Sequence, residues 1–185
     1  MIFIHLAEGF EETEAVTVFD LLKRADLETV FVAVGNENAG SDRRMVKGAH
    51  GIVIKADMVF EEADYSDCSM IVLPGGMAGA LNMQKHPGLI EKIQEFNIRG
   101  KRIAAICAAP MILGDLGILK GKNATIYPGM EEEMKGASPA KTPAVTDGNI
   151  TTGRAPGAAI PFALEIIRIC SGQAAAEQVR EDLAF

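Results

Sequence analysis

The chain has 185 residues, of which 18 are Lys or Arg and 25 are Asp or Glu, so its formal net charge is −7. This balance argues against nucleic acid as the main partner, because phosphate binding requires clustered positive charge. With 48% hydrophobic and 23% charged residues, the composition excludes the disordered and fibrous classes.

Apolar runs of strand length alternate with longer amphipathic stretches, a pattern typical of β-α-β units around a mostly parallel sheet with helices on both faces. In chain order the sequence predicts a strand at 1–6, a helix at 11–24, a strand at 29–34, a hairpin or edge excursion at 40–55, a strand at 70–73, a helix at 86–98, a strand at 102–106, a helix at 108–119, short strands at 124–127, 144–145 and 149–152, and helices at 160–170 and 174–179.

The length suits one domain, which we expect to span residues 1–185. No apolar run approaches the roughly 18 residues of a membrane span. The first strand lacks the basic flank and small-residue cleavage site of a signal peptide. We therefore expect a soluble, cytoplasmic protein that does not associate with membranes.

The cysteines and histidines do not indicate a metal centre. Cys68, Cys107 and Cys170 are widely spaced and form no C-x-x-C pair, which fits a reducing compartment. The three histidines lie in unrelated contexts, and none belongs to a His-x-x-x-His pair. We therefore expect no bound metal.

Cys107 lies where an apolar strand meets a helix, and its neighbours are all small. A sharp strand-to-helix turn of this kind is where a nucleophile elbow would project a side chain above the sheet. The following helix N-terminus is expected to lower the pKa of an accessible thiol below its usual value near 8.5. The alternative is that Cys107 is a buried core residue, as most lone cysteines are.

Two further segments could act with this thiol. Glu8, Glu11, Glu12 and Glu14 crowd the first β-α junction, at the carboxyl edge of the sheet where ligand crevices form. One of them could face the thiol as a general acid and base, or all four could be solvated.

The glycine-rich segment 73–79 could present backbone N–H groups to an oxyanion, or it could be a tight turn only.

Four segments together resemble the ThiJ/PfpI superfamily, and more narrowly the branch of the Parkinson-disease deglycase and its bacterial relatives. They are Glu11–Glu14, Leu73–Gly76, Ala104–Pro110 and Gly153–Gly157, and their order and spacing match along nearly the whole chain. The resemblance implies a flavodoxin-like three-layer sandwich that forms a homodimer.

The resemblance also implies roles for individual residues. Cys107 would be the reactive cysteine at the elbow, Glu14 the acid hydrogen-bonded to its sulfur, and Gly76 and Ala108 the main-chain donors of an oxyanion site. Further residues would line the pocket or the dimer interface, where Arg24 could reach the neighbouring subunit's site: Glu11, Asp20, Arg24, Gly75, Tyr127 and Arg154.

Two positions depart from the family pattern. Relatives often have a histidine where this chain has Tyr127, and a phenol with a pKa near 10 is a poor base at neutral pH. The peptidase branch has a histidine directly after its cysteine, where this chain has Ala108. A cysteine peptidase is therefore not expected.

The resemblance implies a cofactor-independent enzyme that acts on small reactive aldehydes, with glyoxalase or deglycase chemistry on methylglyoxal, glyoxal or their adducts. The alternative is an oxidative-stress sensor or redox-regulated chaperone that uses Cys107 without turnover. A third possibility is an inactive binding domain, which a fold alone does not exclude.

Overall fold

The computed structural model describes residues 1–35 and 42–185. Its main sheet has seven strands in the order β10-β11-β7-β6-β1-β2-β5. Neighbouring strands are parallel except β10, which runs antiparallel to β11. In chain order the strands are β1 (Ile2–Leu6), β2 (Thr29–Ala33), β5 (Met58–Val59), β6 (Met70–Leu73), β7 (Arg102–Ile106), β10 (Ala144–Asp147) and β11 (Ile150–Gly153).

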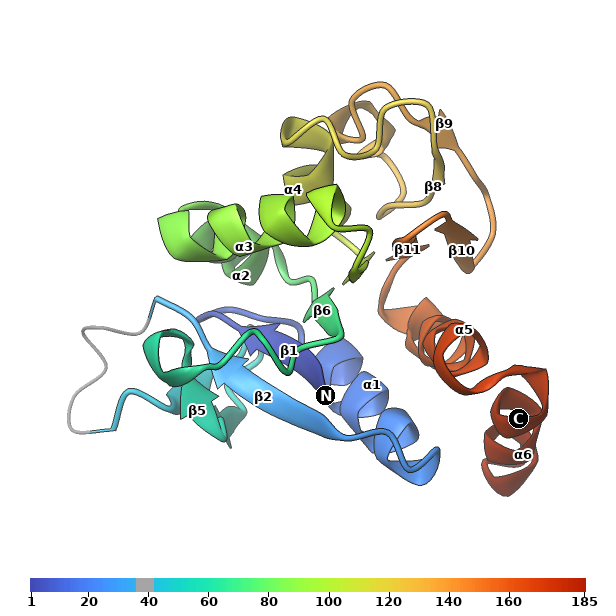
Figure 1. Ribbon diagram of the computed structural model, residues 1–185, viewed down its shortest axis with the longest axis horizontal. Coiled ribbons are helices and arrows are strands. Elements are labelled where there is room, and N and C mark those ends of the chain that lie inside the picture. Colours follow the sequence, from blue (N-terminus) through green and yellow to red (C-terminus); the bar gives the residue numbers. More distant parts are fainter. Residues whose placement is uncertain (36–41) are drawn as a thin grey trace.

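Helices cover both faces of this sheet (Figure 1). One layer contains α1 (Glu12–Arg24), α5 (Ala159–Ser171) and α6 (Gln173–Asp182), and the other contains α2 (Met77–Gln84), α3 (Pro87–Ile98) and α4 (Pro110–Asp115). Alternate residues of β1 serve the two cores, because successive side chains of a strand point to opposite faces. Ile2, Ile4 and Leu6 pack with the first layer, and Phe3 packs with the second. The prediction of an α/β sandwich with a mostly parallel sheet is confirmed.

Two small strand pairs lie outside the main sheet. The antiparallel pair of β3 (Met45–Lys47) and β4 (Val53–Lys55) confirms the hairpin expected within 40–55, of which residues 40–41 lie outside the described part. β8 (Asn123–Ala124) pairs in parallel with β9 (Ser138–Pro139). Short 3-10 helices occur at Phe60–Glu62, Glu131–Glu133 and Pro156–Ala158.

The structure corrects two predicted elements. The helix predicted at 108–119 is only α4, because the chain first turns at the elbow and Gly117 then takes a positive φ of 70°. The strand predicted at 124–127 was also wrong, since only the Asn123–Ala124 pair is strand and Tyr127 turns back toward Cys107. β5 and α2 were not predicted.

Within the described residues, no helix is both long enough and apolar enough to cross a membrane.

Candidate functional site

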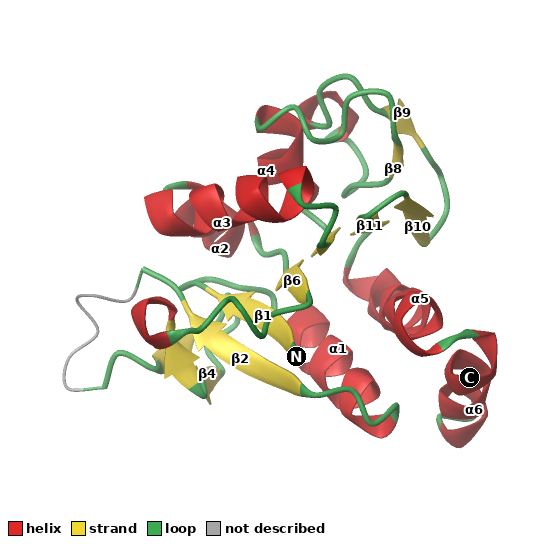
Figure 2. Ribbon diagram, in the orientation of Figure 1, coloured by secondary structure: helices red, strands yellow, loops and turns green. Residues whose placement is uncertain are grey.

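The candidate site lies at the carboxyl ends of three adjacent parallel strands, β1, β6 and β7. The strands β1 and β6 are labelled in Figure 2. Each strand is followed by one part of the site. Glu14 lies in the first turn of α1, Gly75 and Gly76 follow β6, and Cys107 follows β7. Parallel pairing therefore brings together residues that are far apart in the sequence, at the edge of the sheet where ligand crevices form in α/β folds.

Cys107 forms the sharp turn that the sequence predicts. Its φ is 63°, a left-handed conformation that a non-glycine residue adopts at a cost of roughly 1–3 kcal/mol. Hydrogen bonds hold this backbone on both sides: the Cys107 N–H donates to the Gly153 carbonyl at 3.0 Å, and the Tyr127 N–H donates to the Cys107 carbonyl at 2.9 Å. The side chain is thereby directed away from the strand, as at a nucleophile elbow.

Glu14 is fully buried and lies beside Cys107, with Gly75 packed against both side chains. The Gly75 N–H donates to its Oε2 at 2.6 Å. Its Oε1 has no hydrogen-bond partner in the part of the chain that the structure describes. Burial raises the pKa of this carboxyl to about 7, although the Gly75 and Cys107 hydrogen bonds oppose the rise. The group can therefore hold or release a proton near neutral pH.

The environment of the thiol contradicts one expectation. Cys107 is only 8% exposed, and burial together with the neighbouring Glu14 carboxylate raises the pKa of its thiol to about 12. The predictions of an accessible thiol and a lowered pKa were therefore wrong. The backbone N–H groups of Gly76 and Ala108 do lower this pKa, but by less than burial and the carboxylate raise it.

The two glycines after β6 are required by close contacts. A Cβ at Gly75 would lie 2.6 Å from the Cys107 Cβ and 2.7 Å from Glu14 Oε2. Gly76 has a positive φ of 81°, and a Cβ there would lie 2.4 Å from the Gly9 carbonyl oxygen. Any side chain at Gly75 would therefore push the thiol and the carboxyl apart.

The other residues singled out in the sequence lie farther from this pair. Glu11 is the N-cap of α1, and its carboxylate accepts from the Thr13 N–H. Asp20 and Arg24 form an exposed ion pair at 2.8 Å in the later turns of α1, and the role of Arg24 at a neighbouring subunit stays a prediction.

Tyr127 is one of the elbow's two backbone partners, and Arg154 directly follows the other, Gly153. Tyr127 contributes its N–H, while its side chain is 46% exposed. Arg154, next to Gly153, lines a pocket of about 300 Å³ together with Pro128, Pro143 and Pro161. The pocket therefore adjoins the segments that hold Cys107 in its turn.

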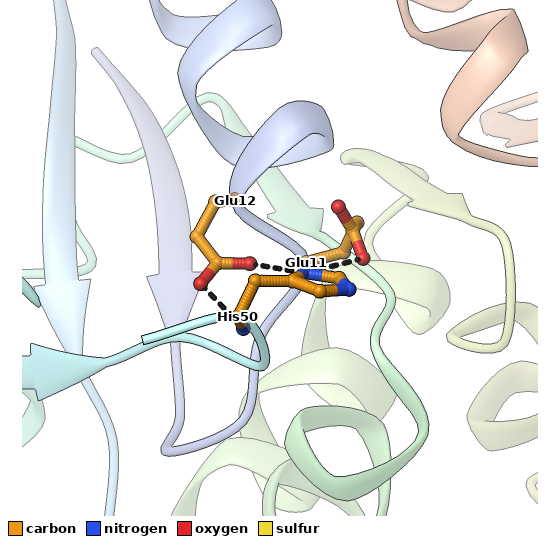
Figure 3. A group of neighbouring side chains, drawn as sticks. All are labelled: Glu11, Glu12 and His50. Atoms are coloured by element: carbon orange, nitrogen blue, oxygen red, sulfur yellow. Dashed lines mark hydrogen bonds and ion pairs between the residues drawn. The ribbon is translucent and has the colours of Figure 1, made fainter. Parts of the chain in front are cut away.

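Sequence reasoning missed His50, which lies between β3 and β4 and contacts Glu12 and Glu11 (Figure 3). The sequence did predict a hairpin in this region. It held no signal for where the hairpin would dock, because that contact depends on the tertiary structure.

Comparison with known proteins agrees with this geometry. The family model described as DJ-1/PfpI family matches residues 1–169. Protein DJ-1 homolog B of Arabidopsis thaliana is 36% identical over 167 residues, which cover 90% of this chain and 37% of the relative. This chain thus spans well under half of that relative, and it also spans under half of the second Arabidopsis homolog.

Other relatives match over most of both lengths. The Parkinson disease protein 7 homolog of Danio rerio is 33% identical, with 96% of this chain and 93% of the relative covered. A deglycase of Pyrococcus abyssi is 29% identical, with 91% of this chain and 98% of the relative covered.

Solved structures of the same superfamily superpose closely. A cysteine-to-alanine mutant of a DJ-1 superfamily protein from Salmonella typhimurium has a TM-score of 0.91 at 28% sequence identity. The match covers 100% of this chain and 97% of the Salmonella chain. Toxoplasma gondii DJ-1, in an oxidized form, has the same TM-score, identity and coverage. Taken with the family model that matches residues 1–169, these likenesses show that the chain belongs to the DJ-1/PfpI family.

Proposed function

We propose that this chain is a cofactor-independent cysteine enzyme acting on small reactive aldehydes such as methylglyoxal and glyoxal, or on their adducts. The observation that carries the proposal is the contact between Cys107 and a buried carboxyl group, Glu14, whose pKa is about 7. A general acid and base works best with a pKa near the operating pH. The deglycase name of the Pyrococcus abyssi relative supports related chemistry in the family.

In the first step, the Cys107 sulfur would add to the aldehyde carbon. A C–S bond forms, the carbonyl π electrons move to oxygen, and the thiol proton passes through Glu14 to the new alkoxide. The N–H groups of Gly76 and Ala108 lower the pKa of the thiol, and in this proposal they also stabilise the developing oxyanion. The product of this step is a hemithioacetal.

In the second step, the Glu14 carboxylate would remove the proton from the former aldehyde carbon and return a proton to the adjacent carbonyl carbon. The hydroxyl proton on the first carbon moves to the oxygen of the second, so the first carbon is oxidised to a thioester and the second is reduced to an alcohol. Water then hydrolyses the thioester and releases lactate from methylglyoxal. The oxidation and the reduction balance within the substrate, so neither glutathione nor another cofactor is consumed.

Lactate formation from methylglyoxal without glutathione tests this proposal. We expect turnover by the unmodified chain, none by Cys107→Ser, and a rate about 10²–10⁴-fold lower for Glu14→Gln. Cys68→Ser is the matched control, because Cys68 is buried elsewhere and its thiol donates to the Met70 carbonyl at 3.2 Å. Unchanged turnover in Cys107→Ser would remove the proposal.

A redox sensor without turnover is the second candidate, and the protonated form of Glu14 is the observation that favours it. A carboxyl that keeps its proton up to about pH 7 can donate a hydrogen bond to a sulfinate formed on Cys107 by peroxide. The oxidized form of Toxoplasma gondii DJ-1 shows that oxidation concerns at least one relative.

Mass spectrometry after mild peroxide treatment tests the sensor. We expect Cys107 to gain two oxygen atoms well before Cys68 or Cys170, and equal oxidation of all three thiols would contradict a sensor role. Lactate turnover separates the two candidates, since a sensor shows none.

We also propose that the chain acts as a cytoplasmic homodimer, with the exposed Asp20 and Arg24 of α1 at the interface. Light scattering of the purified chain measures its mass directly. A monomer at micromolar concentration would contradict this assembly.

A further inference from the structure

A second cluster of chemically active side chains lies at the start of α1 (Figure 3). Glu11 and Glu12 come from the helix N-terminus, and His50 comes from the turn between β3 and β4. The His50 Nδ1 lies 2.9 Å from Glu12 Oε2 and 3.6 Å from Glu11 Oε2. One ligand-type atom from each residue thus lies within 4.8 Å of the other two.

Backbone hydrogen bonds orient both carboxylates toward the imidazole. Glu12 Oε1 accepts from the His50 N–H at 2.7 Å and from the Ile52 N–H at 3.3 Å. Glu11 Oε1 accepts from the Thr13 N–H at 3.3 Å. One oxygen of each carboxylate is therefore held by main chain while the other, Oε2, faces the imidazole. Outer-shell hydrogen bonds of this kind orient the ligands of metal sites.

The hairpin that carries His50 is fixed against the helix start. The Gly9 N–H donates to the Lys47 carbonyl at 2.8 Å, and the Ala49 N–H donates to the Phe10 carbonyl at 2.8 Å. A Cβ at Gly48 would lie 2.4 Å from the Glu12 carboxyl group. A Cβ at this position would therefore displace the Glu12 carboxyl, and the three side chains are held together by backbone on both sides.

We propose that Glu11, Glu12 and His50 bind a divalent transition-metal cation of the Zn²⁺ class. A tetrahedral ion with bonds of about 2.1 Å requires ligand atoms roughly 3.4 Å apart, and the observed separations of 2.9 and 3.6 Å lie on either side of that value. An imidazole ligand favours Zn²⁺ over Mg²⁺ or Ca²⁺.

This ligand set has three protein atoms, which leaves a fourth position for water or another ligand. The spacing of histidines and cysteines along the chain gave no sign of it, because its ligands come from two separate segments. The inference does not depend on the chemistry proposed for Cys107.

Zn²⁺ titration of the full chain, after treatment with a chelator and in competition with a chromophoric chelator, tests the site. The experiment uses Cys107→Ser, because a thiolate beside Glu14 is the obvious competing ligand. We expect one Zn²⁺ per chain, no competition from Mg²⁺, and binding at least about 10–100-fold weaker when His50→Asn is added. Co²⁺ bound in the unmodified chain should show no sulfur charge-transfer band.

Two further variants, one control and one ligand variant, complete the test. Glu8→Gln removes a charge from the same β-α junction outside the cluster, and we expect it to leave Zn²⁺ affinity unchanged. Glu12→Gln keeps an oxygen for the backbone N–H groups but should weaken binding as His50→Asn does. The His50 side chain is 70% exposed, so His50→Asn should fold normally, which circular dichroism would confirm.

Three results would overturn the proposal. Zn²⁺ binding that disappears in Cys107→Ser and survives in His50→Asn alone would identify the thiol as the ligand. Equal weakening by Glu8→Gln would indicate only general attraction by negative charge. No binding at micromolar Zn²⁺ would leave the cluster as an ion pair that fixes the hairpin.

Discussion

The Glu14 carboxyl, on the first turn of α1, lies beside Cys107 at the end of β7, and Gly75 packs against both side chains. The Gly75 N–H holds this carboxyl in place. The pKa values of the two groups, about 7 for the carboxyl and about 12 for the thiol, belong to a coupled pair. The pair therefore releases its first proton near neutral pH and retains the second, which either group can hold.

The buried Glu14 makes stability depend on pH in a defined window. The folded chain keeps the carboxyl proton up to about pH 7, whereas the unfolded chain releases it near pH 4.5. The free energy of unfolding should therefore fall by about 3 kcal/mol as the pH rises across this window. Glu14→Gln cannot titrate and should lose this contribution. Urea unfolding of chelator-treated protein at pH 5 and pH 7.5 measures the difference, and parallel behaviour of the two proteins would contradict it.

Gly75→Ala should disrupt the site, because its new methyl group would press against both the Cys107 Cβ and the Glu14 carboxyl. We expect about 1–3 kcal/mol lower stability and at least about 100-fold slower lactate formation. Gly157→Ala is the control, since a Cβ there meets nothing within 4 Å. An active, stable Gly75→Ala protein would show that the contact is not needed.

Tyr127 should support activity and stability through its backbone N–H group, and its phenol should not be needed. Its N–H donates to the Cys107 carbonyl, while its side chain is largely exposed. We expect Tyr127→Phe to keep lactate formation within about twofold, and Tyr127→Pro, which lacks the N–H, to lose activity and stability. Steady-state rates and thermal melts of both variants check this. A large loss in Tyr127→Phe would instead assign a chemical role to the phenol.

Much of the fold could be predicted because its signals are local. The β-branched and apolar runs of β1, β2, β6 and β7 and the amphipathic pattern of α1 are visible in the sequence. α2 was missed because its segment, Met77–Gln84, has little helical periodicity and begins beside a glycine-rich turn. Its position is fixed by close packing of Gly79 against Phe10, a contact between distant segments.

The proximity of Cys107, Gly75 and Glu14 could be predicted, but their electrostatics could not. The small residues around Cys107 predicted the turn, and the resemblance supplied Glu14 as its partner. The direction of the thiol pKa was wrong because burial and a nearby carboxylate outweigh the neighbouring N–H groups. His50 was missed for a different reason, since only the docking of the hairpin places it beside Glu12.

The alkylation rate of Cys107 as a function of pH, followed by mass spectrometry in chelator-treated protein, tests the shared proton most directly. We predict a step in the rate of the unmodified chain with a midpoint near pH 7, where the pair loses its first proton. Glu14→Gln should lack this step and react faster only at higher pH. A single rise near the ordinary thiol pKa of about 8.5, identical in both proteins, would contradict the shared proton.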